Sequence, residues 1–115
     1  MNRLPNYKNA FIAIEKLTEY CLNNFHPIGK HKAAVFNSAL DLNFNDALLL
    51  KNQILEWLAI NECIKTIGDA FGQRYNVEMK IRIFDKEALL VTAWIIRTIE
   101  DFPRLTTCFI KNKKR

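Results

Sequence analysis

The chain has 115 residues, half of them hydrophobic, and a formal net charge of +5. This length suits one compact domain over 1–115, and three glycines and three prolines are too few for long loops or disordered tracts. The basic charge is compatible with nucleic acid or an acidic protein as a partner and establishes neither.

The three cysteines, Cys21, Cys63 and Cys108, are widely spaced and surrounded by apolar residues. An odd number without paired spacing argues against a disulfide framework and against a zinc site. We therefore expect buried thiols in a cytoplasmic protein. The first residues lead into no apolar segment of an export signal, and no apolar run reaches about 18 residues, so we expect no membrane span.

The first half of the chain has the pattern of helices. Residues 10–14 fit either a short strand or the start of a helix, and 15–22 place their apolar positions on one helical face. A loop at 26–29 contains one proline and one glycine, which shape the backbone before a helix predicted over 30–40.

A third helix is predicted to end near residue 61. Asn45 and Asp46 are plausible N-cap residues for it. Its buried stripe is predicted to contain Ala47, Leu50, Ile54, Trp57 and Leu58.

The second half of the chain has the pattern of strands. From Arg74 onward the apolar residues recur with a period of two, as in a strand with one buried face. Residues 85–86 are predicted to form a hairpin turn, 88–97 a central strand and 104–110 the last strand. The residues predicted to face the core from the first of these strands are Tyr75, Val77, Met79, Ile81 and Ile83.

Helices followed by an antiparallel meander predict an α+β fold. We expect N-terminal helices packed on one face of a three- to four-stranded antiparallel sheet.

The residues capable of chemistry are mainly cations and hydroxyls. No P-loop, dinucleotide fingerprint, zincin helix or nucleophile elbow is present, and Ser38 is the only serine. The carboxylates are scattered, so we expect neither a metal site nor a cofactor. The groups that remain are His31, Lys32, Arg74, Tyr75, Thr92, Arg104, Thr106 and Thr107.

Metal-free RNA cleavage needs groups of this kind. A base takes the proton of the ribose 2′-hydroxyl, an acid protonates the leaving 5′-oxygen, and cations stabilise the charge on the phosphorane. Histidine suits the first two roles, and arginine and lysine suit the third. Each residue also has an ordinary structural interpretation: Arg74 as a surface ion pair, Thr92 as a strand residue, Trp94 as core.

Four blocks of sequence together resemble a small, uncharacterised bacterial domain family. They are H-P-I-G-K-H-K-A-A-V-F (26–36), F-G-Q-R-Y-N-V (71–77), V-T-A-W-I-I (91–96) and P-R-L-T-T (103–107). The arrangement of helices, sheet and these groups is also similar to the barnase, EndoU, colicin and RelE group of ribonuclease toxins, which is a more distant resemblance. The chain departs from the family pattern between its two long strands, where the expected glycine turn is missing.

The resemblance implies roles for individual residues. His31 becomes the general acid/base, Lys32 or Arg74 the phosphate ligand, and Thr92 and Thr107 the hydroxyls bonded to the scissile phosphate. The further candidates for substrate binding are His26, Tyr75, Trp94 and Arg104, with Arg104 at the rim.

The last strand poses a geometric condition. Arg104 and Thr107 have opposite parity, so both reach one cleft only if a β-bulge lies between them or Arg104 belongs to the turn. Otherwise Thr106 takes the place of Thr107.

The resulting hypothesis is a metal-independent endoribonuclease toxin of a bacterial toxin–antitoxin system, with RNA (tRNA or mRNA) and a cognate antitoxin or immunity protein as partners. The alternative is a non-catalytic protein-binding module, such as an antitoxin, an immunity protein or a toxin inhibitor. A DNA-binding regulator fits poorly because the chain has no second helix rich in Arg, Asn and Gln. The catalytic hypothesis requires the 26–32 segment and the sheet to line one pocket.

Overall fold

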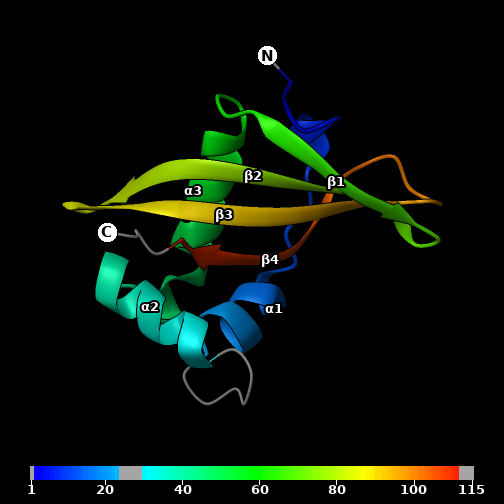
Figure 1. Ribbon diagram of the computed structural model, residues 1–115. Coiled ribbons are helices and arrows are strands. Elements are labelled where there is room, and N and C mark those ends of the chain that lie inside the picture. Colours follow the sequence, from blue (N-terminus) through cyan, green and yellow to red (C-terminus); the bar gives the residue numbers. More distant parts are fainter. Residues whose placement is uncertain (1, 24–29, 112–115) are drawn as a thin grey trace.

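Four antiparallel strands form the centre of the molecule. The computed structural model describes residues 2–23 and 30–111. The strands lie in the order β1-β2-β3-β4, so β1 and β4 are the edges of the sheet (Figure 1). They are β1 (Cys63–Asp69), β2 (Gly72–Ile83), β3 (Lys86–Arg97) and β4 (Arg104–Ile110). The predicted α+β class is confirmed.

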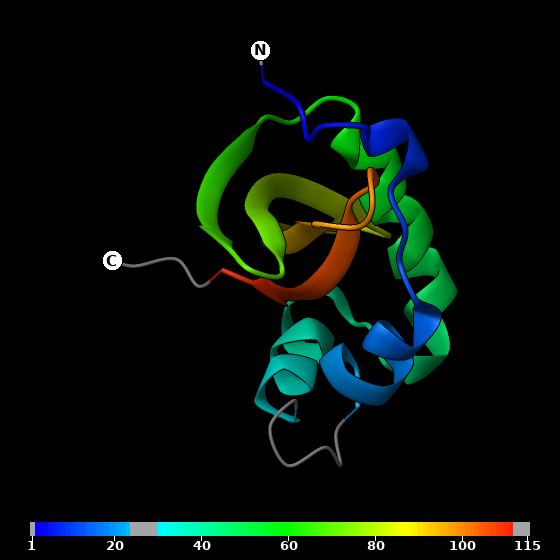
Figure 2. The same cartoon turned by 90° about the vertical axis from the view of Figure 1, so that its right-hand side faces the viewer.

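The helical elements cover one face of the sheet and one of its edges. Helix α3 crosses one face, and α1 and α2 lie beside β4 (Figures 1 and 2). The elements are η1 (Tyr7–Asn9), α1 (Ile14–Lys16), the π-helical turn η2 (Leu17–Cys21), α2 (Lys30–Leu40), η3 (Phe44–Asp46) and α3 (Ala47–Leu58). The face opposite α3 is called the outer face below.

The core forms where the predicted apolar stripes meet. Strand β2 alternates as expected, with Val77, Met79 and Ile81 buried and Lys80 and Arg82 exposed. These side chains pack in one cluster with residues from α2 and α3, namely Phe36, Leu40, Ala47, Leu50, Ile54 and Leu58. The expected helical stripes are therefore confirmed, except that Trp57 is only partly buried.

Strand β1 is absent from the sequence interpretation. Apart from Cys63, which is half-buried, its side chains are exposed, including Ile64 and Ile67. Because neither face of β1 is buried, the strand has no alternation of apolar and polar residues to reveal it.

Two local features refine the sequence interpretation. Asp46 is the N-cap residue of α3, as predicted, but its side chain makes no capping bond to that helix. The capping box belongs to the preceding turn η3, where the Asn43 side chain accepts a hydrogen bond from the Asn45 N–H while Asp46 accepts one from the Asn43 N–H. The β2–β3 turn is Phe84 and Asp85, since Ile83 already pairs with Lys86. Phe84 adopts a φ of 57°, so this turn uses the left-handed region without glycine.

A bulge in β4 meets the geometric condition set by the sequence. Ala93 pairs with Thr107, but the next residue, Trp94, pairs with Leu105, so one extra residue lies in β4. Since Arg104 pairs with Ile95, Arg104 and Thr107 both lie on the outer face.

Thr92 and Trp94 lie in the core, on the face covered by α3. Thr92 is fully buried; its hydroxyl donates to the Val77 carbonyl at 2.9 Å and accepts from the Trp94 indole N–H at 2.8 Å. Trp94 is 1% exposed. The expected direct contacts of these two residues with a substrate are therefore corrected: both are buried, and their polar atoms bond each other and the backbone.

Removing the Thr92 hydroxyl tests this interpretation. We expect Thr92→Val to lower the free energy of unfolding by about 1–3 kcal/mol, because the Trp94 N–H is left buried without an acceptor. Urea denaturation followed by tryptophan fluorescence measures the loss. Thr92→Ser keeps the hydroxyl and should lose only about 1 kcal/mol for its missing methyl group. Equal losses in the two variants would show that these hydrogen bonds do not stabilise the fold.

Candidate functional site

A groove lies between α2 and the edge strand β4. His31, Lys32 and Val35 of α2 line it on one side, and Phe109 and Ile110 of β4 line it on the other. Its volume is about 200 Å³, and His31 is exposed at its rim. Helix 30–40 and the sheet therefore line one pocket through His31 and Lys32. His26 and the rest of the 26–29 loop lie outside the described residues.

Lys32 connects the helix to the sheet. Its ammonium donates to the Thr107 hydroxyl at 2.8 Å and lies 5.7 Å from the centroid of the Phe109 ring. Both contacts bring a positive charge over β4, where the hydroxyl of Thr107 is held in place. This pair has the composition of a phosphate site, because an ammonium and a hydroxyl both donate hydrogen bonds to phosphate oxygens.

Two thiols lie behind this pair. The Cys21 sulfur is 3.8 Å from the Thr107 hydroxyl oxygen and 3.8 Å from the Cys108 sulfur. The hydrogen bond donated by Cys108, assisted by Thr107 and the charge of Lys32, lowers the pKa of Cys21 to about 6 against the opposing effect of burial. The same bond and full burial raise the pKa of Cys108. The expectation that the cysteines are buried is confirmed for Cys21 and Cys108, while Cys63 is half-buried.

A larger cavity begins on the other side of Thr107. It has a volume of about 460 Å³ and is lined by Ala13, Glu15, Lys16, Glu19, Thr106 and Thr107. Glu15 and Glu19 were interpreted from the sequence as solvated helix residues. Their spacing of four places like charges on one helical face, which is unfavourable without a compensating role and is the signal that could have identified them.

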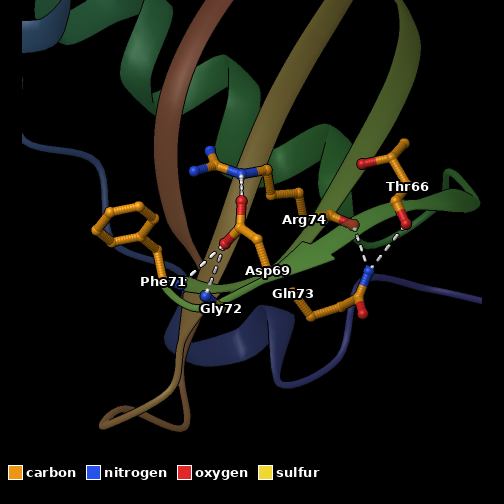
Figure 3. A network of polar contacts seen from close by, with 6 residues as sticks. All are labelled: Thr66, Asp69, Phe71, Gly72, Gln73 and Arg74. Atoms are coloured by element: carbon orange, nitrogen blue, oxygen red, sulfur yellow. Dashed lines mark hydrogen bonds and ion pairs between the residues drawn. The ribbon is translucent and has the colours of Figure 1, made fainter.

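Arg74 belongs to the β1–β2 hairpin rather than to this groove. Its guanidinium lies 3.5 Å from one carboxylate oxygen of Asp69, and the other oxygen accepts from the N–H groups of Phe71 and Gly72 (Figure 3). Gly72 has a φ of 151°, and a Cβ there would lie 2.2 Å from the Ile96 carbonyl oxygen. Only glycine fits this turn.

The register of the sheet sets the distance between Arg74 and Thr107. Arg74 shares a cross-strand row with Arg104, whereas Asn76 shares the row of Thr107, so all are on the outer face. With strands about 4.8 Å apart, the Arg74 and Thr107 backbones are separated by roughly 12 Å. In the structure the Arg74 guanidinium is paired with Asp69 at this distance from Thr107, and the Lys32 ammonium bonds Thr107 itself.

Arg104 is held by its own surroundings. Its guanidinium bonds both carboxylate oxygens of Glu100 at 2.8 Å and lies 5.0 Å from the ring centroids of Phe11 and Phe102. Arg97 bonds the same carboxylate. These contacts fix the turn that leads into β4.

The two remaining candidate residues, Tyr75 and Thr106, lie in different places. Tyr75 faces the core side and packs against the buried cluster. Thr106 occupies the bulge, and its hydroxyl donates to the Ala93 carbonyl at 3.1 Å. Of the sequence-derived set, the structure thus brings together His31, Lys32 and Thr107, with Thr106 beside them at the larger cavity.

The Glu100 ion pairs predict a dependence of stability on pH. Hydrogen bonds from Arg104 and Arg97 lower the pKa of Glu100 from its ordinary value of 4.5 to about 2. Its contribution to stability is therefore complete above pH 4.5 and is lost as the pH falls towards 2. We expect Glu100→Gln to have a lower thermal midpoint than the wild type at pH 7 and the same midpoint near pH 2.

The matched control is Glu87→Gln, which removes an exposed carboxylate at the β2–β3 hairpin. Its midpoint should follow that of the wild type across the range. A deficit of Glu100→Gln that persists unchanged to pH 2 would contradict the electrostatic origin of the effect.

In 2–23 and 30–111, no three His, Cys, Asp or Glu side chains are grouped as metal ligands would be. Over the same ranges, no helix is long and apolar enough to cross a membrane.

Fold and groove together define a small α+β domain with a helix closing on the edge of an open sheet. A family model described as a domain of unknown function, DUF6883, matches residues 3–112. The chain belongs to this family, and the expected resemblance to a small uncharacterised domain family is confirmed. The chain matches no curated protein and no solved structure.

Proposed function

We propose that this protein is a metal-independent endoribonuclease that cleaves RNA at the Lys32–Thr107 contact. The observation that carries the proposal is the 2.8 Å bond between the Lys32 ammonium and the Thr107 hydroxyl, with His31 exposed in the groove that Lys32 also lines. A cation, a hydroxyl and an imidazole at one site are the groups that phosphate transesterification requires.

The phosphate binds where two donors converge. A non-bridging phosphate oxygen replaces Thr107 as a partner of the Lys32 ammonium, and the Thr107 hydroxyl donates to the same phosphate. The negative charge of the phosphorane grows beside a fixed positive charge, which stabilises the transition state more than the bound RNA.

Two proton carriers flank this position. His31 lines the groove that contains Lys32, and Glu19 lines the cavity that contains Thr107. One of them takes the proton of the 2′-hydroxyl, and the other protonates the 5′-oxygen as its bond to phosphorus breaks. The products are a 2′,3′-cyclic phosphate and a 5′-hydroxyl.

The surroundings have room and charge for a polynucleotide. The larger cavity, at about 460 Å³, accommodates a base next to the scissile phosphate. Arg74 lies on the same outer face about 12 Å away, a distance suited to a phosphate further along the strand. The net charge of +5 favours association with RNA.

An enzyme of this kind damages the cell that makes it. We therefore place it in the cytoplasm as the toxin of a toxin–antitoxin pair, as the resemblance to ribonuclease toxins implies. Its protein partner is an antitoxin or immunity protein that covers the groove.

Incubation of the purified chain with total RNA in EDTA tests the activity. We expect fragments ending in 2′,3′-cyclic phosphate, and a decrease in rate of roughly 100-fold or more for His31→Ala, Lys32→Ala and Thr107→Val. Lys65→Ala is the control: Lys65 is an exposed lysine in β1, at the opposite edge of the sheet, and its removal should leave the rate unchanged.

Each result has a distinct meaning. Undiminished cleavage by His31→Ala would remove His31 from the mechanism. Intact RNA with the wild-type chain across tRNA, mRNA and rRNA, together with normal growth on induced expression, would reject the ribonuclease and support a protein-binding module.

A further inference from the structure

A pair of cysteines beneath the site has no role in the cleavage proposed above. Cys21 ends the π-helical turn η2, and Cys108 lies in β4, 87 residues further along the chain. Both side chains are fully buried, yet their sulfur atoms are only 3.8 Å apart. Cys21 also contacts Thr107, so the pair is connected to the phosphate site through one hydroxyl.

We propose that Cys21 and Cys108 form a redox site, in which hydrogen peroxide converts the two thiols to a disulfide and thereby displaces the groups around Thr107. The oxidation depends only on the two thiols. Its effect on RNA cleavage rests on the proposed function.

The geometry requires a small movement. A disulfide bond is about 2.05 Å long, so the sulfur atoms must approach each other by roughly 1.8 Å. Cys108 is held in β4, next to Thr107, which pairs with Ala93 of β3. Cys21 belongs to a single π-helical turn, a less stable conformation than an α-helix, so the movement falls on η2.

The movement alters the site in two ways. The Cys21 sulfur turns from Thr107 towards Cys108, so the Thr107 hydroxyl loses a partner that fixes its orientation. Glu19 belongs to the same turn and lines the larger cavity, so its carboxylate moves with Cys21. Both changes affect groups that the proposed cleavage uses.

The chemistry needs one molecule of hydrogen peroxide. The Cys21 thiolate attacks one peroxide oxygen, the O–O bond breaks, and the released hydroxide takes a proton to become water. The Cys108 sulfur then attacks the resulting sulfenic acid, the S–O bond breaks, and the oxygen leaves as a second water with the Cys108 proton. Two electrons pass from the thiols to the peroxide.

Two features of the structure favour this reaction at Cys21. The lowered pKa of its thiol, about 6, provides the thiolate that reacts with peroxide. The larger cavity reaches Thr107, which contacts the Cys21 sulfur and gives a small oxidant a short route from solvent. Cys63 differs in that burial raises the pKa of its thiol, and it lies in β1 at the opposite edge of the sheet, away from the Cys21–Cys108 pair.

Thiol counting on the intact chain tests the oxidation. The protein has three cysteines, so the reduced chain should take three alkyl groups and the peroxide-treated chain only one, with a mass lower by two hydrogen atoms before alkylation. Peptide mapping should find the bond between Cys21 and Cys108. Cys63→Ser should still form it, and Cys108→Ser should not; Cys108→Ala replaces the serine variant if that variant fails to fold.

The effect on cleavage is measured separately. Oxidation should slow RNA cleavage about tenfold, with recovery on adding dithiothreitol, while Cys21→Ala, which lacks the thiol that reacts with peroxide, should be insensitive to peroxide. Three alkyl groups after peroxide treatment would overturn the redox site. A disulfide formed with cleavage unchanged would overturn its influence on the site. A disulfide formed in a chain that never cleaves RNA would leave the redox site standing and reject the ribonuclease.

Discussion

One extra residue in β4 determines which side chains can act together. The bulge at Thr106 returns Thr107 to the outer face that Arg104 already occupies. Without it, Thr107 would point into the core and Thr106 would take the outer position in its place. Cys108 takes the inward position instead and meets Cys21 there. The Lys32–Thr107 contact and the thiol pair therefore both depend on this irregularity.

The inward face is stabilised by packing around one polar group. Thr92 is a buried polar residue whose hydroxyl bonds both Trp94 and the Val77 backbone. A buried indole N–H needs an acceptor, and the neighbouring β3 threonine supplies it. This arrangement explains why a threonine and a tryptophan two residues apart occur in the stretch of β3 from Ala88 to Ile96, where every other side chain is apolar. The Thr-x-Trp pattern therefore marks a position where the strand faces the core.

The edge strand β4 is where chemistry becomes possible. The centre of the sheet is closed by its own hydrogen bonds and by α3 (Figure 2). At β4, the side chains of α2 and η2 approach Thr107 from two directions, through Lys32 and Cys21. Thr107 thus contacts the Lys32 ammonium and the Cys21 thiol, and it also lines the larger cavity. A change in the position of either neighbour therefore alters the hydrogen bonding of the same Thr107 hydroxyl.

The sequence by itself determined the elements whose periodicity follows burial. The buried stripe of α3 and the alternation of β2 were predicted because each element has one buried face. It also placed His31, Lys32 and Thr107 among the candidate site residues, because the residues capable of chemistry were mainly cations and hydroxyls. The exposed strand β1 was not predicted, because a periodic pattern of apolar residues arises only where one face of an element is buried.

Only the tertiary structure decided which candidates share a surface. Strand register and a single bulge separate Thr92, Trp94 and Tyr75 from Thr107, and the Asp69 ion pair holds Arg74 at the hairpin. These outcomes depend on pairings between strands far apart in the chain. A local pattern cannot specify them, because shifting the register by one residue exchanges the two faces of a strand.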